Sequence, residues 1–190
     1  MKWENVNKDI MISPDGMGIV FYSDGAVKDI PIGEDFLKNE YWAPEKVAAH
    51  INRGDIVGLC TEGDAGEFVL RFRSGYPDDE IAEKYPAHLR LGIEVMGNTI
   101  NVIDLFWLDD WQNDCPPEQQ IEVEPGFYQM TFCGEPPMRA VENELTDEEY
   151  DEYIDKPRII YVFLSKVEAL PKRDYKGVPD IYWAYPEGNN

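Results

Sequence analysis

The sequence predicts a mainly β protein, an antiparallel β-sandwich with two or three short helices, built as one domain over residues 1–190. Apolar residues alternate with polar ones along residues 89–95, which is typical of a strand with one buried face. Turn residues recur about every 8–12 residues, as in sandwiches. An apolar fraction of 43% is enough for a real core, so a compact sandwich is expected.

The centre of the predicted sheet runs from residue 89 to residue 133. Residues 89–96 and 99–107 flank Gly97-Asn98, a dipeptide that favours a hairpin turn. An acidic loop is expected over residues 108–118. Further strands are expected at residues 121–123 and 127–133, on either side of the Pro125-Gly126 turn.

The segments before this centre are expected to form two hairpins and two helices. The first 18 residues look irregular, and the hairpins are expected over residues 18–30 and 55–73. A helix is predicted at residues 43–54, because Pro44 suits a first turn and Gly54 suits a C-terminal cap. One or two helical turns are expected at residues 77–85.

Two elements are predicted after the centre. Residues 142–155 are strongly acidic, and Thr146 with Glu149 matches a capping box, which favours a short helix. Residues 158–167 form the most apolar strand pattern of the chain, typical of a central strand. The remaining tail is expected to be a loop that packs along the sheet.

The charge of the chain restricts its partners. With 38 acidic and 17 basic residues, the formal net charge is −21. Nucleic acid and anionic membranes are therefore disfavoured as ligands, and a basic protein is the natural complement. The alternative is that the charge serves only solubility. The sequence starts without an apolar signal segment and has three widely spaced cysteines, so a cytoplasmic location is expected.

Catalytic, metal and cofactor sites are not predicted. The two histidines, His50 and His88, and the thiol of Cys60 occur in no motif for nucleophilic catalysis. Acidic residues cluster at 109–114, but their order does not match a calcium-binding loop. We therefore expect no catalytic residue, no metal and no cofactor, and interpret this segment as a solvated acidic loop.

The predicted site is instead a pair of acidic segments, residues 142–155 and the loop 109–114, which we expect to bind a protein partner. Tyrosine interleaves with the acids of the predicted helix, and tyrosine is enriched in binding hot spots. The alternative interpretation of such a charge run is a solvated helix face. The predicted partner-binding residues are Glu142, Glu144, Asp147, Glu148, Glu149, Tyr150, Asp151, Glu152, Asp109 and Asp110.

Two segments carry a family resemblance. The run Gly92-Ile93-Glu94-Val95, followed by Pro125-Gly126-Phe127-Tyr128-Gln129-Met130-Thr131, resembles the small bacterial β-sandwich proteins of the competence-protein-J and toxin-immunity kind. The resemblance covers about a quarter of the chain. It implies an inhibitor role against a nuclease or toxin, and it assigns no binding residue.

Three functions remain open from the sequence. The leading hypothesis is an acidic inhibitor that neutralises a basic protein. The first alternative is a carboxylate-dependent hydrolase of a small or sugar-like substrate, which would need a pocket with a carboxyl group of raised pKa. The second alternative is a structural protein that forms a homo-oligomer through its aromatic tail, at Tyr182, Trp183 and Tyr185.

Overall fold

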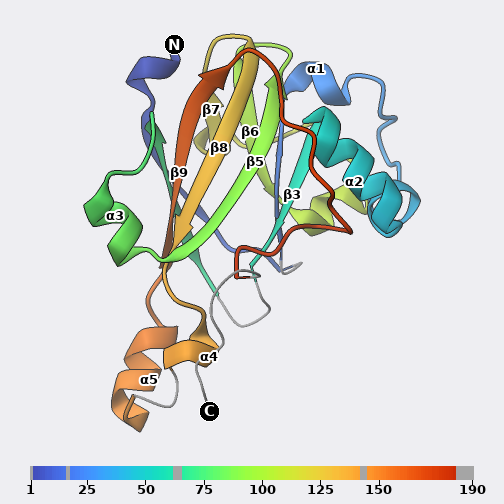
Figure 1. Ribbon diagram of the computed structural model, residues 1–190. Helices are drawn as coiled ribbons and strands as arrows, with labels where there is room; N and C mark the ends of the chain where they lie inside the picture. The colour runs from blue at the N-terminus through green and yellow to red at the C-terminus, as the bar shows by residue number, and fades with distance from the viewer. Residues whose placement is uncertain (1, 16–17, 62–65, 142–144, 183–190) are drawn as a thin grey trace.

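Two β-sheets packed face to face form the body of the protein in the computed structural model (Figure 1). The structure describes residues 2–15, 18–61, 66–141 and 145–182. Within these residues it contains nine strands and several short helices, so the predicted fold class is confirmed. None of the described helices is long and apolar enough to span a lipid bilayer.

The larger sheet, sheet A, faces the viewer in Figure 1 and has the strand order β1-β4-β9-β8-β5. Sheet B lies behind it, with the order β3-β2-β6-β7. The strands are β1 (Asn7–Ile12), β2 (Gly18–Tyr22), β3 (Ile56–Cys60), β4 (Phe68–Ser74), β5 (Ala87–Val95), β6 (Thr99–Asp104), β7 (Gln120–Glu122), β8 (Gly126–Gly134) and β9 (Arg158–Val167).

Short helices connect the strands. The α-helices are α1 (Asp24–Val27), α2 (Pro44–Arg53), α3 (Asp79–Lys84), α4 (Met138–Val141) and α5 (Asp147–Ile154). The 3-10 turns are η1 (Trp3–Asn5), η3 (Leu105–Leu108) and η4 (Pro117–Gln119), and η2 (Leu37–Tyr41) is a π-helical turn. Helices α2, α3 and α5 confirm three sequence predictions.

The core lies between the inner faces of the two sheets. Phe21 of sheet B contacts Phe72 and Phe132 of sheet A, with ring centroids 6.3 and 5.5 Å apart. Aromatic pairs in this tilted geometry stabilise beyond the area they bury. The central position predicted for residues 158–167 is confirmed, because β9 lies between β4 and β8. Its pairing with β4 is parallel, which departs from a purely antiparallel sandwich.

The two predicted hairpins around residues 55–73 and 89–107 are wrong. Strands β3 and β4 belong to different sheets, and so do β5 and β6. Gly97 and Asn98 therefore carry the chain from one sheet to the other. Across the core, β5 packs against β2 and β3 of sheet B, so its apolar side is buried between the two sheets.

The hairpin predicted over residues 18–30 is also wrong, because α1 (Asp24–Val27) follows β2. The Ser23 hydroxyl accepts a hydrogen bond from the Met96 amide at 2.9 Å and donates to the Glu94 carbonyl at 3.3 Å. Ser23 is thus tied to the end of β5, and the chain bends away from β2. The irregular start that was predicted is in fact strand β1, which pairs with β4.

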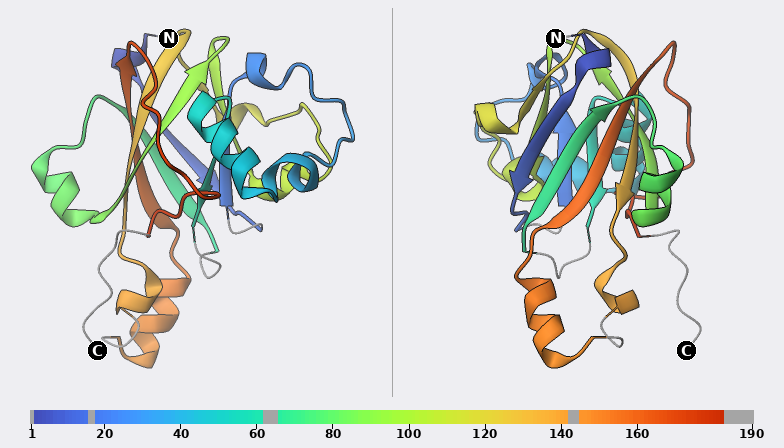
Figure 2. Two further views of the ribbon diagram at one scale, coloured as in Figure 1. Left: turned by 45° about the vertical axis from the view of Figure 1, so that its right-hand side comes forward. Right: turned by 90° about the vertical axis from the view of Figure 1, so that its left-hand side faces the viewer.

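Two excursions leave the sandwich, and we call them the arm and the strap. The arm connects β8 to β9, and its described residues, 135–141 and 145–157, project beyond one end of the sheets (Figures 1 and 2). The strap, residues 168–182, runs from β9 across β5 to β3. There the Cys60 amide donates to the Pro179 carbonyl at 2.8 Å, and the Ile181 amide donates to the Cys60 carbonyl at 3.2 Å.

Candidate functional site

The acidic loop begins at a fixed point, because Asp104 caps the turn η3. Its carboxylate accepts hydrogen bonds from the Phe106 amide at 3.2 Å and from the Asp15 amide at 2.9 Å. An aspartate at this position satisfies amide groups that a helical turn leaves unpaired. Leu108 and Trp111 are buried and anchor the middle of the loop in the core.

A second contact holds the loop against residues 33–34. The Gly33 amide donates to the Trp111 carbonyl at 2.9 Å, and the Trp111 amide donates to the Glu34 carbonyl at 3.0 Å. The indole ring of Trp111 packs edge-on against Tyr22, with centroids 5.3 Å apart. The loop is therefore held by backbone and core contacts, which pre-organises the side chains that it exposes.

Between these anchors the loop exposes two large aromatic side chains. Phe106 is 53% exposed and Trp107 is 40% exposed. They line a hollow of about 300 Å³ together with four polar side chains. The lining residues are Phe106, Trp107, Asp109, Asp110, Gln112 and Asp114. We call this site the acidic-aromatic hollow. Aromatic faces and carboxylates both attract ammonium and guanidinium groups.

The arm is the second acidic surface. Its helix α5 begins with the predicted capping box. The Glu149 carboxylate accepts hydrogen bonds from the Thr146 amide and hydroxyl, both at 2.9 Å, and these bonds lower the pKa of Glu149. Glu148, Glu149 and Tyr150 are exposed. The capping box therefore orders a helix whose outer side is anionic.

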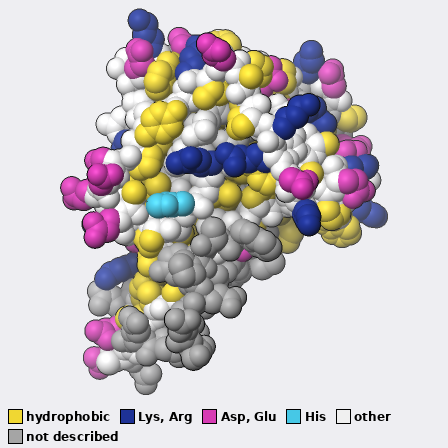
Figure 3. Space-filling view, in the orientation of Figure 1, with side chains coloured by type: hydrophobic (Ala, Val, Ile, Leu, Met, Phe, Trp, Pro, Cys, Tyr) yellow, Lys and Arg dark blue, Asp and Glu magenta, His cyan; other side chains and the backbone are white. Residues whose placement is uncertain are grey.

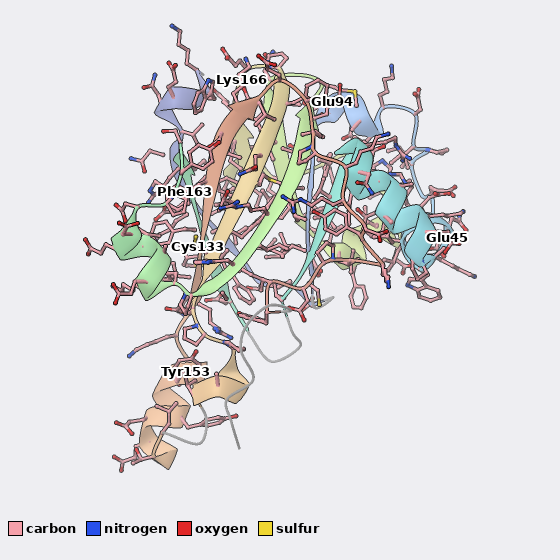
Figure 4. All side chains as sticks on the ribbon, viewed as in Figure 1. Glu45, Glu94, Cys133, Tyr153, Phe163 and Lys166 are labelled. Atoms are coloured by element: carbon pink, nitrogen blue, oxygen red, sulfur yellow. The ribbon has the colours of Figure 1, made fainter. Side chains whose placement is uncertain are left out.

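One arginine connects the arm to the body. The guanidinium of Arg158, at the start of β9, lies 5.7 Å from the ring centre of Tyr153 and 5.5 Å from that of Tyr182. It also donates a hydrogen bond to the Pro136 carbonyl. Tyr153 lies on the part of the arm nearest the sheets (Figure 4). Arg158 is only 7% exposed, so it joins arm, strap and sheet in one buried contact.

The predicted partner-binding residues do not form one surface. Asp109 and Asp110 are exposed at the hollow, and Glu148, Glu149 and Tyr150 are exposed on the arm. The two views of Figure 2 place the arm and the acidic loop well apart. Glu142 and Glu144 lie outside the described residues. The side chains of Asp147, Asp151 and Glu152 also lie outside the description, although their backbone belongs to α5.

The sequence prediction missed Phe106 and Trp107, which it assigned to a strand. The signal was present, because two adjacent large aromatics directly before an acidic run cannot both face one core in a strand. The turn η3 places both at the surface.

Neither histidine is among the residues that line the hollow. His50, on α2, is 8% exposed, and its Nδ1 lies 2.8 Å from Asp55. Its Nε2 lies 3.5 Å from Glu40. Burial opposes ionisation of Asp55, but hydrogen bonds with His50 and Arg53 outweigh it and keep the pKa of Asp55 below its usual value. This cluster fixes the end of α2 against β3.

We expect Asp55→Asn to destabilise the protein at neutral pH by about 1–2 kcal/mol, because a hydrogen-bonded charge is lost. A carboxyl group whose pKa is lower in the folded state stabilises above its unfolded pKa, and this stabilisation disappears as the pH falls through the folded value. The difference from the unmodified protein should therefore be smaller at about pH 3 than at about pH 7. Urea unfolding at both pH values measures this, and a constant difference would contradict it.

The carboxyl groups with displaced pKa values in the described part of the chain give no support to the hydrolase alternative. Asp55, Glu124 and Glu149 all have lowered pKa values. A general acid in glycoside hydrolysis needs the opposite shift. Within the described residues, no group of three His, Cys, Asp or Glu is placed to hold a metal ion.

The tail gives little support to the assembly alternative. Tyr182 is 1% exposed and packs against Arg158 of its own chain. Its ring is therefore not a surface for a second copy. Trp183 and Tyr185 lie outside the described residues.

Comparison with known proteins gives a likeness of fold. No known protein family matches the chain, and no curated protein matches it. The structure of ComJ from Bacillus subtilis, an inhibitor of the DNA-degrading activity of NucA, is similar with a TM-score of 0.49 and 11% identity, over 85% of this chain and 98% of ComJ. The crocagin biosynthetic gene J protein is similar with a TM-score of 0.47 and 16% identity, over 83% of this chain and 96% of the other. The predicted resemblance is confirmed for the fold, and it fixes no function.

Proposed function

We propose that this protein is a cytoplasmic binding protein that docks a basic protein at the acidic-aromatic hollow. A nuclease or toxin that acts on nucleic acid is the partner class that fits best. Such an enzyme needs a Lys/Arg surface to hold phosphates. A protein that covers this surface with carboxylates blocks the substrate and thereby inhibits the enzyme.

One observation carries the proposal, namely that exposed aromatics and carboxylates meet at one hollow. Binding hot spots are aromatic side chains surrounded by a polar rim that excludes water. Phe106 and Trp107 supply the apolar centre, and Asp109, Asp110 and Asp114 supply the charge.

Charge reversal at the hollow is expected to slow association with the partner. The variant Asp109→Lys/Asp110→Lys should lower the association rate constant by about tenfold at low salt, because charges at an interface rim steer the encounter. The rate should also depend less on ionic strength. Stopped-flow mixing over a series of salt concentrations measures both effects.

The partner is obtained by comparative capture. The unmodified chain and the Asp109→Lys/Asp110→Lys variant are immobilised separately and exposed to an extract of the native host. Proteins that are retained only by the unmodified chain are then purified. If the purified protein cleaves DNA or RNA, its activity is assayed with and without this chain. A retained protein that is neutral or acidic, or an unchanged association rate, would refute the proposal.

The arm provides the matched control. Glu148→Lys/Asp155→Lys makes the same change in net charge at a separate acidic surface and keeps the cap made by Glu149 (Figure 2). If the arm variant slows association and the hollow variant does not, the partner binds the arm, and the assignment to the hollow is wrong.

A further inference from the structure

The outer face of sheet A carries cationic side chains, although the protein as a whole is strongly acidic. Two neighbouring rows cross this face in the order β1-β4-β9-β8-β5. They contain Asp9, Arg71, Tyr161, Cys133 and His88 in one row, and Asn7, Arg73, Phe163, Thr131 and Arg90 in the next. Alternation along each strand places the core residues on the opposite face.

The cations near β1 have a structural role. Arg73 donates to the Asp9 carboxylate at 2.8 Å, and Arg71 donates to the Tyr161 hydroxyl at 3.0 Å. Both guanidinium groups lie over the Tyr161 ring, 5.5 and 5.8 Å from its centre. These contacts hold the two arginines in place and neutralise part of their charge.

Towards β5 the cations are exposed and reinforced by the strap. The Tyr175 hydroxyl donates to the Arg90 carbonyl at 3.1 Å, which places the strap beside β5. Arg90, Lys172, Arg173 and Lys176 are all exposed and outnumber the exposed carboxylate among them, Asp174. We call these four cations the cationic face. Figure 3 shows a band of Lys and Arg across the middle of this side, with a histidine below and carboxylates towards the margins.

The complementary surface is present in the same chain. The arm exposes Glu148, Glu149, Tyr150 and Asp155. It projects beyond the end of the sheets and away from the cationic face (Figures 1 and 2). The arm and the cationic face therefore lie apart within one molecule, and a contact between these two surfaces joins two copies.

We propose that the acidic arm of one copy docks on the cationic face of a second copy, head to tail. Such a contact joins two different surfaces, so it generates chains or closed rings. At about 0.15 M ionic strength the Debye length is about 8 Å. The repulsion between the net negative charges of the two copies is then largely screened, whereas ion pairs in direct contact are screened much less. The contact depends on neither the hollow nor its partner.

A charge-swap experiment on the full chain tests the proposal. The face variant is Arg90→Glu/Arg173→Glu, and the arm variant is Glu148→Lys/Asp155→Lys, which preserves the cap made by Glu149. Sedimentation velocity of the unmodified chain should show weight-average mass rising with concentration. Each variant alone should associate at least about tenfold more weakly. An equimolar mixture should regain association, because each altered surface then meets opposite charge.

Matched controls separate this contact from effects of net charge. Lys28→Glu/Lys38→Glu repeats the charge change of the face variant, and Glu4→Lys/Glu45→Lys repeats that of the arm variant, at exposed positions away from both surfaces (Glu45 is labelled in Figure 4). Both controls should associate like the unmodified chain.

Three results would overturn the proposal. The first is that the unmodified chain stays monomeric at every concentration. The second is that the equimolar mixture of face and arm variants sediments as two monomers. The third is that the control variants associate as weakly as the face and arm variants. Single-stranded DNA of mixed sequence is added as a further probe. If it binds the unmodified chain but not the face variant, the cationic face takes nucleic acid instead of the arm.

Discussion

Replacing Trp107 with alanine is expected to weaken binding of the basic partner by about 30-fold or more, which corresponds to about 2 kcal/mol. Trp107 is 40% exposed beside carboxylates and is held by a loop that is anchored in the core. The loss should appear mainly in the dissociation rate, because packing contacts form after the encounter. Titration calorimetry and dissociation kinetics with the captured partner measure it.

Tyr76 supplies the matched control for this substitution. It is 62% exposed, in the connection between β4 and α3, and Tyr76→Ala should leave affinity unchanged. Both variants should unfold at nearly the temperature of the unmodified chain, because neither ring belongs to the core. Equal losses of affinity in the two variants would mean that the partner does not recognise the hollow.

Replacing Arg158 with methionine is expected to lower the free energy of unfolding by about 2–3 kcal/mol. Methionine has a similar length, but it loses the hydrogen bond to the Pro136 carbonyl and the cation contacts with Tyr153 and Tyr182. The expected decrease in melting temperature is about 5–10 °C for a chain of this size. Limited proteolysis should show faster cleavage within residues 135–157, where the anchor is lost.

Arg53→Met is the control for Arg158→Met. The Arg53 side chain is 54% exposed and pairs with Asp55 at 2.7 Å, and exposed ion pairs contribute about 0–1 kcal/mol. If the two variants lose the same stability, or if the arm of the Arg158 variant resists protease as before, Arg158 is not the anchor of the arm.

The sequence was sufficient to predict where most strands and helices lie, but not which strands pair with each other. The alternation of apolar and polar residues located β5, and a run of apolar residues located β9. Pro44 and Gly54 marked the ends of α2, and the capping box marked the start of α5. Pairing is decided by contacts far apart in sequence, and a Gly-Asn dipeptide is compatible both with a hairpin and with a crossing between sheets. The bend after β2 depends on one hydroxyl group, that of Ser23, meeting the end of β5. A single sequence does not reveal that contact.

The candidate site was predicted only in part, again because contacts between residues far apart in the chain are not visible in a single sequence. The acids of the loop and arm are visible in the sequence, because charge runs are local. The exposed aromatics depend on where β6 ends and η3 begins. The cationic face depends on strand register and on the strap, which bring Arg90 beside residues about 80 positions later in the chain.

The arm is inserted between β8 and β9, two strands that are direct neighbours in sheet A, with Gly134 paired to Ile160. Its two ends therefore leave and re-enter the sheet at adjacent points. Lengthening such a loop twofold adds only about 0.6 kcal/mol of closure entropy. This scaffold can consequently accept a longer, shorter or differently charged insertion at that point and keep its strand order. The arm is therefore free to diversify while the buried core of the sandwich stays the same.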